Sequence, residues 1–156
     1  MGSGKTTVGR LLGLETGWPF IDLDATIEAG QGLTIREIFE RQGEPFFRQL
    51  EHAALWEVSK TEPAVVALGG GTWVQHANFE LIRSTGGATV FLDCSLEELR
   101  RRCAAIDNRP LFRDPESFAH LFAQRLPYYR LAEFHIDADS LPPEEVVRRI
   151  LRLRIF

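Results

Sequence analysis

The first residues of the chain constrain its fold and chemistry more than any other stretch. Gly2-Ser3-Gly4-Lys5-Thr6-Thr7 has the spacing of the second half of a phosphate-binding loop. In such loops glycines let backbone N–H groups converge on phosphate oxygens, the lysine reaches the β- and γ-phosphates, and the next hydroxyl binds Mg²⁺. The helix that follows directs its positive end at the same phosphates. The pattern therefore predicts that Lys5 contacts the phosphates of a nucleoside triphosphate and that Thr6 contacts Mg²⁺.

The match to the full pattern G-x-x-x-x-G-K-[ST] is partial. Gly4-Lys5-Thr6 is present, whereas the first glycine would fall before Met1, and no strand precedes the loop. A chance glycine- and serine-rich start, for example a cloning remnant, stays open as a second interpretation of these residues.

Length and charge exclude several classes of protein. The 156 residues suit one compact domain with a real core. The net charge is −4 and no basic run is longer than Arg100–Arg102, which argues against a nucleic-acid partner. No apolar run reaches the ~18 residues of a membrane span, and no secretory signal is present. Cys94 and Cys103 do not suggest a disulfide framework, so we expect a cytoplasmic protein. Because no apolar run is long enough, we also expect no membrane partner.

Apolar runs typical of buried strands alternate with amphipathic stretches typical of helices. This alternation favours an α/β fold with a parallel sheet. We expect strands near 18–21, 64–68, 88–92 and 134–137, and helices near 6–16, 25–29, 34–39, 45–59, 76–84, 96–102, 115–131 and 143–153. Capping boxes, Thr34 with Glu37 and Ser95 with Glu98, mark two of the helix starts.

Two stretches follow predicted strands and are therefore expected where open parallel sheets bind ligands. Asp22 and Asp24 follow the first strand and point the same way if its geometry continues. The alternative is that Asp24 only caps the next helix. Gly69-Gly70-Gly71 follows the strand at 64–68. These glycines either let the backbone approach a ligand closely or simply allow a tight turn.

Two other segments contain arginines, and each of these segments can be interpreted in two ways. Arg48 can form helix-surface ion pairs with Glu44 or Glu51, or can bind a ligand. The segment 106–115 is polar, is broken by prolines and contains Arg109. Such a segment is either a surface loop without a catalytic role or a lid that excludes water during phosphoryl transfer.

Taken in order, these pieces resemble the shikimate kinase family over nearly the whole chain. The matching segments are 2–9, 20–24, 34–39, Gly43-Glu44, Phe47-Arg48 with Glu51, 69–71, 109–111, and Arg125 with Tyr129. The phosphate loop alone is shared by a vast superfamily, whereas the ordered set is far more specific. The resemblance implies a three-layer P-loop kinase fold in one domain, 1–156, with sheet order 2-3-1-4-5 and a lid at about 106–116.

The resemblance implies transfer of the γ-phosphate of ATP to the 3-hydroxyl of shikimate. The product would be shikimate 3-phosphate, on the route to chorismate and the aromatic amino acids. ATP and Mg²⁺ are the implied cofactors, shikimate is the implied partner, and we expect a monomer. Phosphoryl transfer depends mostly on positioning and electrostatic stabilisation, so few reactive side chains are needed.

The resemblance also implies individual roles. ATP would be bound by Gly2, Ser3, Gly4, Lys5, Thr6, Thr7, Arg102, Arg109 and Pro142, and the metal by Thr6 and, through water, Asp22. Shikimate would be bound by Asp24, Phe47, Arg48, Gly69, Gly70, Gly71 and Arg125. Among these, Lys5 and Arg109 would supply catalytic positive charge, and Asp24 would orient the attacking hydroxyl. Two arginines suit the carboxylate of shikimate because a planar guanidinium binds a carboxylate in bidentate fashion.

The chain departs from the family at its start, where members have a first strand and the first loop glycine. That strand is central in the implied sheet, so strands near 64–68 and 88–92 would each lack a neighbour. The explanations are an upstream start, a strand from another chain, or an inactive relative; we favour an upstream start because the later site residues are intact. Alternative functions are another small-molecule kinase, such as a gluconate kinase, or a nucleotide-binding module without catalysis.

Overall fold

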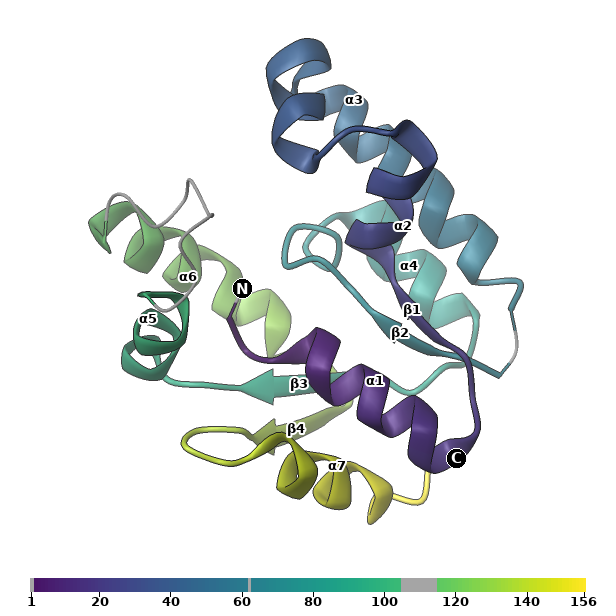
Figure 1. Ribbon diagram of the computed structural model, residues 1–156, viewed down its shortest axis with the longest axis vertical. Coiled ribbons are helices and arrows are strands. Elements are labelled where there is room, and N and C mark those ends of the chain that lie inside the picture. Colours follow the sequence, from purple (N-terminus) through teal and green to yellow (C-terminus); the bar gives the residue numbers. More distant parts are fainter. Residues whose placement is uncertain (1, 62, 105–114) are drawn as a thin grey trace. The chain divides into compact units, whose positions relative to one another are not determined.

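The computed structural model describes residues 2–61, 63–104 and 115–156. The chain divides into two compact units, one formed by Met1–Leu11 with Ala88–Phe156 and the other by Leu12–Gly87. Figure 1 traces the elements of each unit. The organisation of the chain as one domain stays a prediction.

Helices and strands alternate along the chain as predicted. In chain order the elements are α1 (Lys5–Thr16), β1 (Phe20–Asp22), α2 (Leu23–Gln31), α3 (Ile35–Val58), β2 (Val65–Ala67), α4 (His76–Ser84), β3 (Val90–Asp93), α5 (Leu96–Ala104), α6 (Pro115–Tyr129), β4 (Phe134–Asp137) and α7 (Pro143–Leu151). Each predicted strand and helix is present, with small shifts at the ends.

The strands form two separate parallel pairs in the part of the chain that the structure describes. β1 pairs with β2, with Phe20 opposite Val65, and β3 pairs with β4, with Val90 opposite Phe134. Within the described residues neither β2 nor β3 has a second strand partner. This confirms the expectation that these two strands would each lack a neighbour. In the predicted order 2-3-1-4-5, the pairs 2-3 and 4-5 lie on either side of strand 1. The two observed strand pairs correspond to these two pairs.

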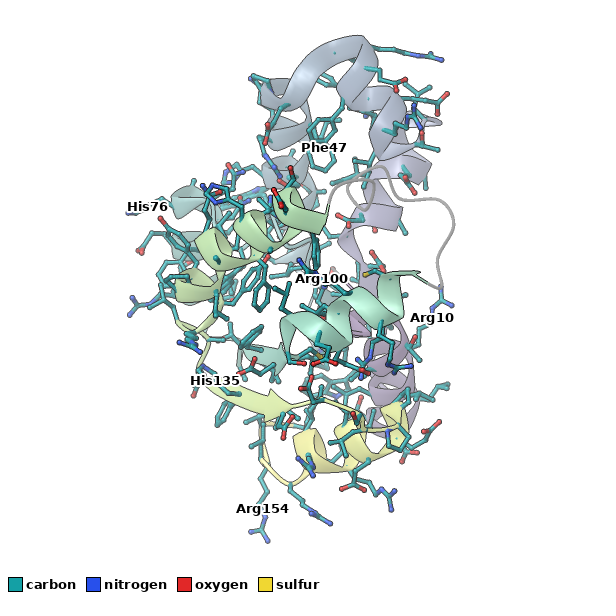
Figure 2. All side chains as sticks on the ribbon, turned by 90° about the vertical axis from the view of Figure 1, so that its left-hand side faces the viewer. Arg10, Phe47, His76, Arg100, His135 and Arg154 are labelled. Atoms are coloured by element: carbon teal, nitrogen blue, oxygen red, sulfur yellow. The ribbon has the colours of Figure 1, made fainter. Side chains whose placement is uncertain are left out.

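A cluster of apolar side chains holds α2 against α3 in the unit Leu12–Gly87. Its buried members are Leu23, Ile27, Ile38, Phe47 and Leu55. Figure 2 shows Phe47 among these helices, and its ring centroid lies 4.8 Å from that of Phe39. Each buried side chain of this size contributes roughly 1.5–3 kcal/mol. The cluster therefore fixes the part of α3 that carries the predicted substrate residues.

A backbone break at Gly43 divides α3, in agreement with the two separate helices expected near 34–39 and 45–59. Gly43 has φ 80° and ψ 169°, a combination that is essentially restricted to glycine. Pro45 suits the first turn of the second segment, where a missing N–H breaks no helical hydrogen bond. The capping box at the start of α3 is also confirmed, because the N–H of Glu37 donates to Thr34 Oγ1 and the Glu37 carboxylate accepts from the N–H of Thr34.

The second predicted capping box is only half formed. The N–H of Glu98 donates to Ser95 Oγ at 3.2 Å, as expected. The N–H of Ser95, however, donates to Asp139 Oδ1 at 2.7 Å. The Glu98 carboxylate instead accepts hydrogen bonds from Arg101 and Arg102. Two arginines on the same helix face outcompete a single backbone N–H for this carboxylate.

In the other unit, α7 packs along β4 (Figure 1). Val146, Val147 and Ile150 form its buried face. Among the described residues, no helix is both long enough and apolar enough to cross a membrane.

Candidate active site

The phosphate loop has the backbone conformation that its glycines predict. Gly2 and Gly4 have φ values of 72° and 86°, in the region that favours glycine. A side chain at Gly2 would also collide with Cys103 Sγ. α1 begins at Lys5, and its first hydrogen bond runs from the N–H of Val8 to the Gly4 carbonyl at 2.9 Å. Lys5 therefore lies in the first turn of a helix, where the helix dipole favours phosphate oxygens.

Arg102 joins the phosphate loop to two other parts of its unit. Its Nη2 donates to the Ala138 carbonyl at 2.7 Å, and its Nη1 lies 3.5 Å from the Ser3 carbonyl. Its Nε donates to Glu98 Oε1 at 2.7 Å. Hydrogen bonds from Arg101 and Arg102 lower the pKa of Glu98 to about 2. The predicted nucleotide residues Ser3 and Arg102 thus lie together, and Glu98 orients Arg102, a role that the sequence did not reveal.

Two further predicted residues lie in the same unit. Pro142 occupies the N-cap of α7, and its carbonyl accepts from the N–H of Glu145 at 3.0 Å. Arg125, on α6, lies one helical turn before Tyr129 and hydrogen-bonds to its phenol. Burial raises the pKa of Tyr129, while the charge of Arg125 and this hydrogen bond act in the opposite direction. Tyr129 thus restricts the orientation of the Arg125 guanidinium.

The structure corrects the sequence interpretation of Asp22 and Asp24. β1 ends at Asp22, and its side chain caps α2 by accepting from the N–H of Ala25 at 3.4 Å. Asp24 already lies in the first turn of α2, so strand alternation does not align the two carboxylates. The cap is Asp22 and not Asp24, because the helix begins at the fully buried Leu23, earlier than predicted.

The turn Gly69–Thr72, called the glycine turn below, lies between a carboxylate and a guanidinium. A Cβ at Gly69 would lie 2.7 Å from Asp24 Oδ1, and one at Gly71 would lie 2.5 Å from Arg48 Nη1. Neither glycine has a positive φ. Close approach, and not a special backbone conformation, therefore favours glycine at both positions, because a Cβ would displace the end of the Asp24 or the Arg48 side chain. Asp24, Arg48 and the glycine turn form a single cluster, which we call the acid cluster.

Arg48 forms both ion pairs that its helical spacing predicts. Its Nη1 lies 2.6 Å from Glu51 Oε2, and its Nη2 lies 2.7 Å from Glu44 Oε1. Burial alone would lower the pKa of Arg48, but hydrogen bonds to Glu51 and Glu44 hold it above its usual value. The ion pairs do not exclude ligand binding, because a guanidinium carries more N–H donors than these contacts use.

Glu51 is a buried carboxylate, and the sequence interpretation missed its burial. Its exposure is 1%, whereas its helical spacing from Arg48 predicts a surface ion pair. The signal was available in the helical spacing, because Phe47, Glu51 and Leu55 recur at every fourth position and all three are buried. A carboxylate within an apolar stripe requires a specific partner.

The predicted metal ligands fit Mg²⁺ in their chemistry. The Thr6 hydroxyl and the Asp22 carboxylate are hard oxygen donors, which Mg²⁺ prefers. The described residues contain no cluster of three or more His, Cys, Asp or Glu side chains that could hold a metal. Mg²⁺ commonly binds through one or two protein oxygens together with phosphates and water, so such a cluster is not required. Arg109 and most of the predicted lid lie outside the described residues.

Comparison with known proteins decides the family. The model of the shikimate kinase family matches residues 1–154. The chain is 43% identical over 152 residues to the shikimate kinase of Moorella thermoacetica, covering 96% of this chain and 87% of the relative. The chain belongs to the shikimate kinase family. The match includes the phosphate loop, so the interpretation of Gly2–Thr7 as a chance start is wrong.

Solved structures agree with this family. Shikimate kinase from Acinetobacter baumannii, solved in complex with shikimate, has a TM-score of 0.92 and 35% identity, covering 99% of this chain and 88% of that chain. A gluconokinase from Sinorhizobium meliloti has a TM-score of 0.64 at 23% identity, covering 97% of this chain and 85% of that one, which shows a shared fold alone. As a member of the shikimate kinase family, the chain is an ATP-dependent phosphotransferase with a P-loop α/β fold.

Proposed function

We propose that this protein transfers the γ-phosphate of ATP to the 3-hydroxyl of shikimate, a step in aromatic amino acid biosynthesis. The acid cluster is the observation that carries the proposal. It offers the Asp24 carboxylate as an acceptor for substrate hydroxyls and the Arg48 guanidinium as a donor to a substrate carboxylate, with glycine backbone between them. A small acid with several hydroxyls presents the complementary groups.

The roles of the acid-binding residues follow from their chemistry. Asp24 hydrogen-bonds the attacking hydroxyl and can accept its proton. Arg48 and Arg125 bind the carboxylate, and the Gly70 N–H donates to the substrate. The buried Phe47 supports Arg48, whose guanidinium carbon lies 5.3 Å from the Phe47 ring centroid. This arrangement positions the nucleophile, which is where phosphoryl-transfer enzymes gain most of their rate.

The nucleotide-binding roles fall to the phosphate loop and its neighbours. Residues 2–7 hold the phosphates, with Lys5 supplying positive charge, while Arg102 and Pro142 flank the adenine. Thr6 and Asp22 would hold Mg²⁺, which supplies further charge neutralisation when bound. Arg109 would add positive charge as the transition state develops. The expected monomeric state and cytoplasmic location stay predictions.

An acceptor panel tests the proposed function. The full chain is incubated with Mg-ATP and either shikimate, gluconate or no acceptor, and the products are followed by ³¹P NMR. We expect a new phosphate-ester signal with shikimate only, assigned to the 3-position. Phosphorylation of gluconate in place of shikimate would contradict the proposal. Binding of ATP with no transfer to shikimate would also contradict it and would favour a nucleotide-binding module without catalysis.

A further inference from the structure

A buried polar network lies beneath the glycine turn. Glu51, Thr72 and Asn78 come from α3, the glycine turn and α4, and are 1%, 0% and 1% exposed. Burying such groups is costly unless they are hydrogen-bonded. Every buried polar side-chain atom in the described residues has a partner. A fully satisfied network of this kind fixes the segments that it connects.

Thr72 is the residue on which the network converges. Its N–H donates to the Gly69 carbonyl at 3.1 Å and closes the turn. Its hydroxyl donates to Glu51 Oε1 at 2.5 Å. Its carbonyl accepts from Asn78 Nδ2 at 3.2 Å. One buried residue therefore connects the turn to α3 through its side chain and to α4 through its backbone.

Asn78 is held in turn by His52. Asn78 Oδ1 lies 2.7 Å from His52 Nδ1. Because Asn78 Nδ2 donates to Thr72, Oδ1 is the accepting atom, and His52 Nδ1 must carry a hydrogen. This hydrogen bond fixes the orientation of the Asn78 amide, so that its Nδ2 faces the Thr72 carbonyl.

We propose that Thr72, anchored by Asn78, is a positioning residue for acid binding at Arg48. The Glu51 carboxylate accepts from Thr72 through Oε1 and from Arg48 through Oε2. Thr72 therefore fixes the rotation of this carboxylate, and the carboxylate fixes the guanidinium beside Gly71. Thr72 is assigned no contact with the substrate. The inference deepens the proposed function and rests on it.

A pair of variants at Thr72 tests the inference through steady-state kinetics. Thr72→Val keeps the shape of the side chain and removes the hydroxyl, whereas Thr72→Ser keeps the hydroxyl. We expect Thr72→Val to raise KM for shikimate roughly tenfold or more, since a hydrogen bond to a charged group is lost. KM for ATP should change less than about twofold, and Thr72→Ser should restore the KM for shikimate. Equal increases in both KM values, or no increase for shikimate, would overturn the inference.

A second measurement does not depend on shikimate turnover. The exchange of the Arg48 Nη1 protons, which donate to Glu51, is followed by NMR in the unliganded protein and both variants. We expect slow exchange in the parent and in Thr72→Ser, and at least tenfold faster exchange in Thr72→Val. Unchanged exchange in Thr72→Val would overturn the inference even if the parent phosphorylates shikimate. A parent that does not turn over shikimate contradicts the proposed function, while the exchange data still decide whether Thr72 positions Arg48.

Asn78→Asp tests the anchor with an isosteric change. The variant keeps an oxygen that accepts from His52 and replaces the Nδ2 donor with an oxygen facing the Thr72 carbonyl. We expect KM for shikimate to rise several-fold with KM for ATP nearly unchanged. A variant that melts cooperatively like the parent and keeps the parent's KM for shikimate would show that Asn78 does not anchor the turn.

Discussion

Gly69 leaves space that the side chains of Asp24 and Thr72 occupy. Its backbone is not in the region that favours glycine, yet a Cβ would lie 2.7 Å from Asp24 Oδ1 and 3.0 Å from Thr72 Oγ1. An alanine there is therefore compatible with the local backbone but not with the position of the Asp24 carboxylate. The position of the Asp24 carboxylate therefore depends on the absence of a side chain at Gly69.

Gly69→Ala should accordingly damage catalysis more than folding. We expect kcat with shikimate to fall about tenfold to a hundredfold, because a displaced carboxylate no longer orients the hydroxyl. Gly30→Ala is a matched control, since Gly30 lies in α2 with nothing near its Cβ position. It should leave kcat unchanged and stabilise the protein by up to about 0.5–1 kcal/mol. Parallel losses of kcat in both variants, or none in Gly69→Ala, would contradict this explanation.

Among the helices, α3 is divided by the break at Gly43. This break sets the direction of the helical segment that follows it, which carries Phe47 and Arg48. The ion pairs of Arg48 with Glu44 and Glu51 all lie beyond the break. A continuous helix would direct this segment differently. Gly43 is therefore expected to contribute to acid binding, although it has no part in the acid cluster.

Gly43→Ala tests the role of the break. Alanine at φ 80° and ψ 169° should lower the free energy of unfolding by about 1–3 kcal/mol. It should also weaken shikimate binding, because the segment after the break would shift. Urea unfolding and shikimate titration measure the two effects, with Gly30→Ala as the control. A Gly43→Ala protein as stable as its parent would show that the observed break is not needed.

The ion pairs on α5 predict a pH dependence of stability. Arg101 and Arg102 lower the folded-state pKa of Glu98 from 4.5 to about 2. Because the pKa is depressed by folding, the stabilisation is present above pH 4.5 and is lost as pH falls toward 2. In Glu98→Gln this component should be absent.

Urea unfolding at a series of pH values measures this effect. The stability difference between the parent and Glu98→Gln should be constant above about pH 5.5 and should shrink below about pH 4.5. Glu57→Gln serves as the control, because Glu57 and its partner Lys60 are both exposed and should contribute little. A difference that stays constant down to pH 2.5 would contradict the assignment.

Across the molecule, structural features that depend on neighbouring residues are predicted well from the sequence. Features that depend on residues distant in the sequence are predicted poorly. The phosphate loop, the Thr34–Glu37 capping box and the break at Gly43 follow from neighbouring residues, and all three are confirmed. The start of α2 was predicted too late because Asp22 and Asp24 are both good caps and burial of Leu23 decides between them. The half-formed box at Ser95 depends on Asp139, which is distant in sequence.

The acid cluster was predictable only in part. The resemblance named Asp24, Arg48 and the three glycines, and the structure brings them together. Thr72 and Asn78 carry no local signal, because their hydrogen bonds form only when the glycine turn, α3 and α4 pack against one another. Arg109 remains a sequence prediction, since it lies outside the described residues.

We propose that Arg48 recognises a carboxylate on the phosphate acceptor. Isothermal titration of the full chain with shikimate and with its methyl ester tests this claim without altering the protein. We expect the ester to bind at least roughly tenfold more weakly, because it lacks the negative charge and the second equivalent oxygen that a bidentate ion pair with a guanidinium uses. Equal affinity for shikimate and its methyl ester would show that Arg48 does not recognise the carboxylate.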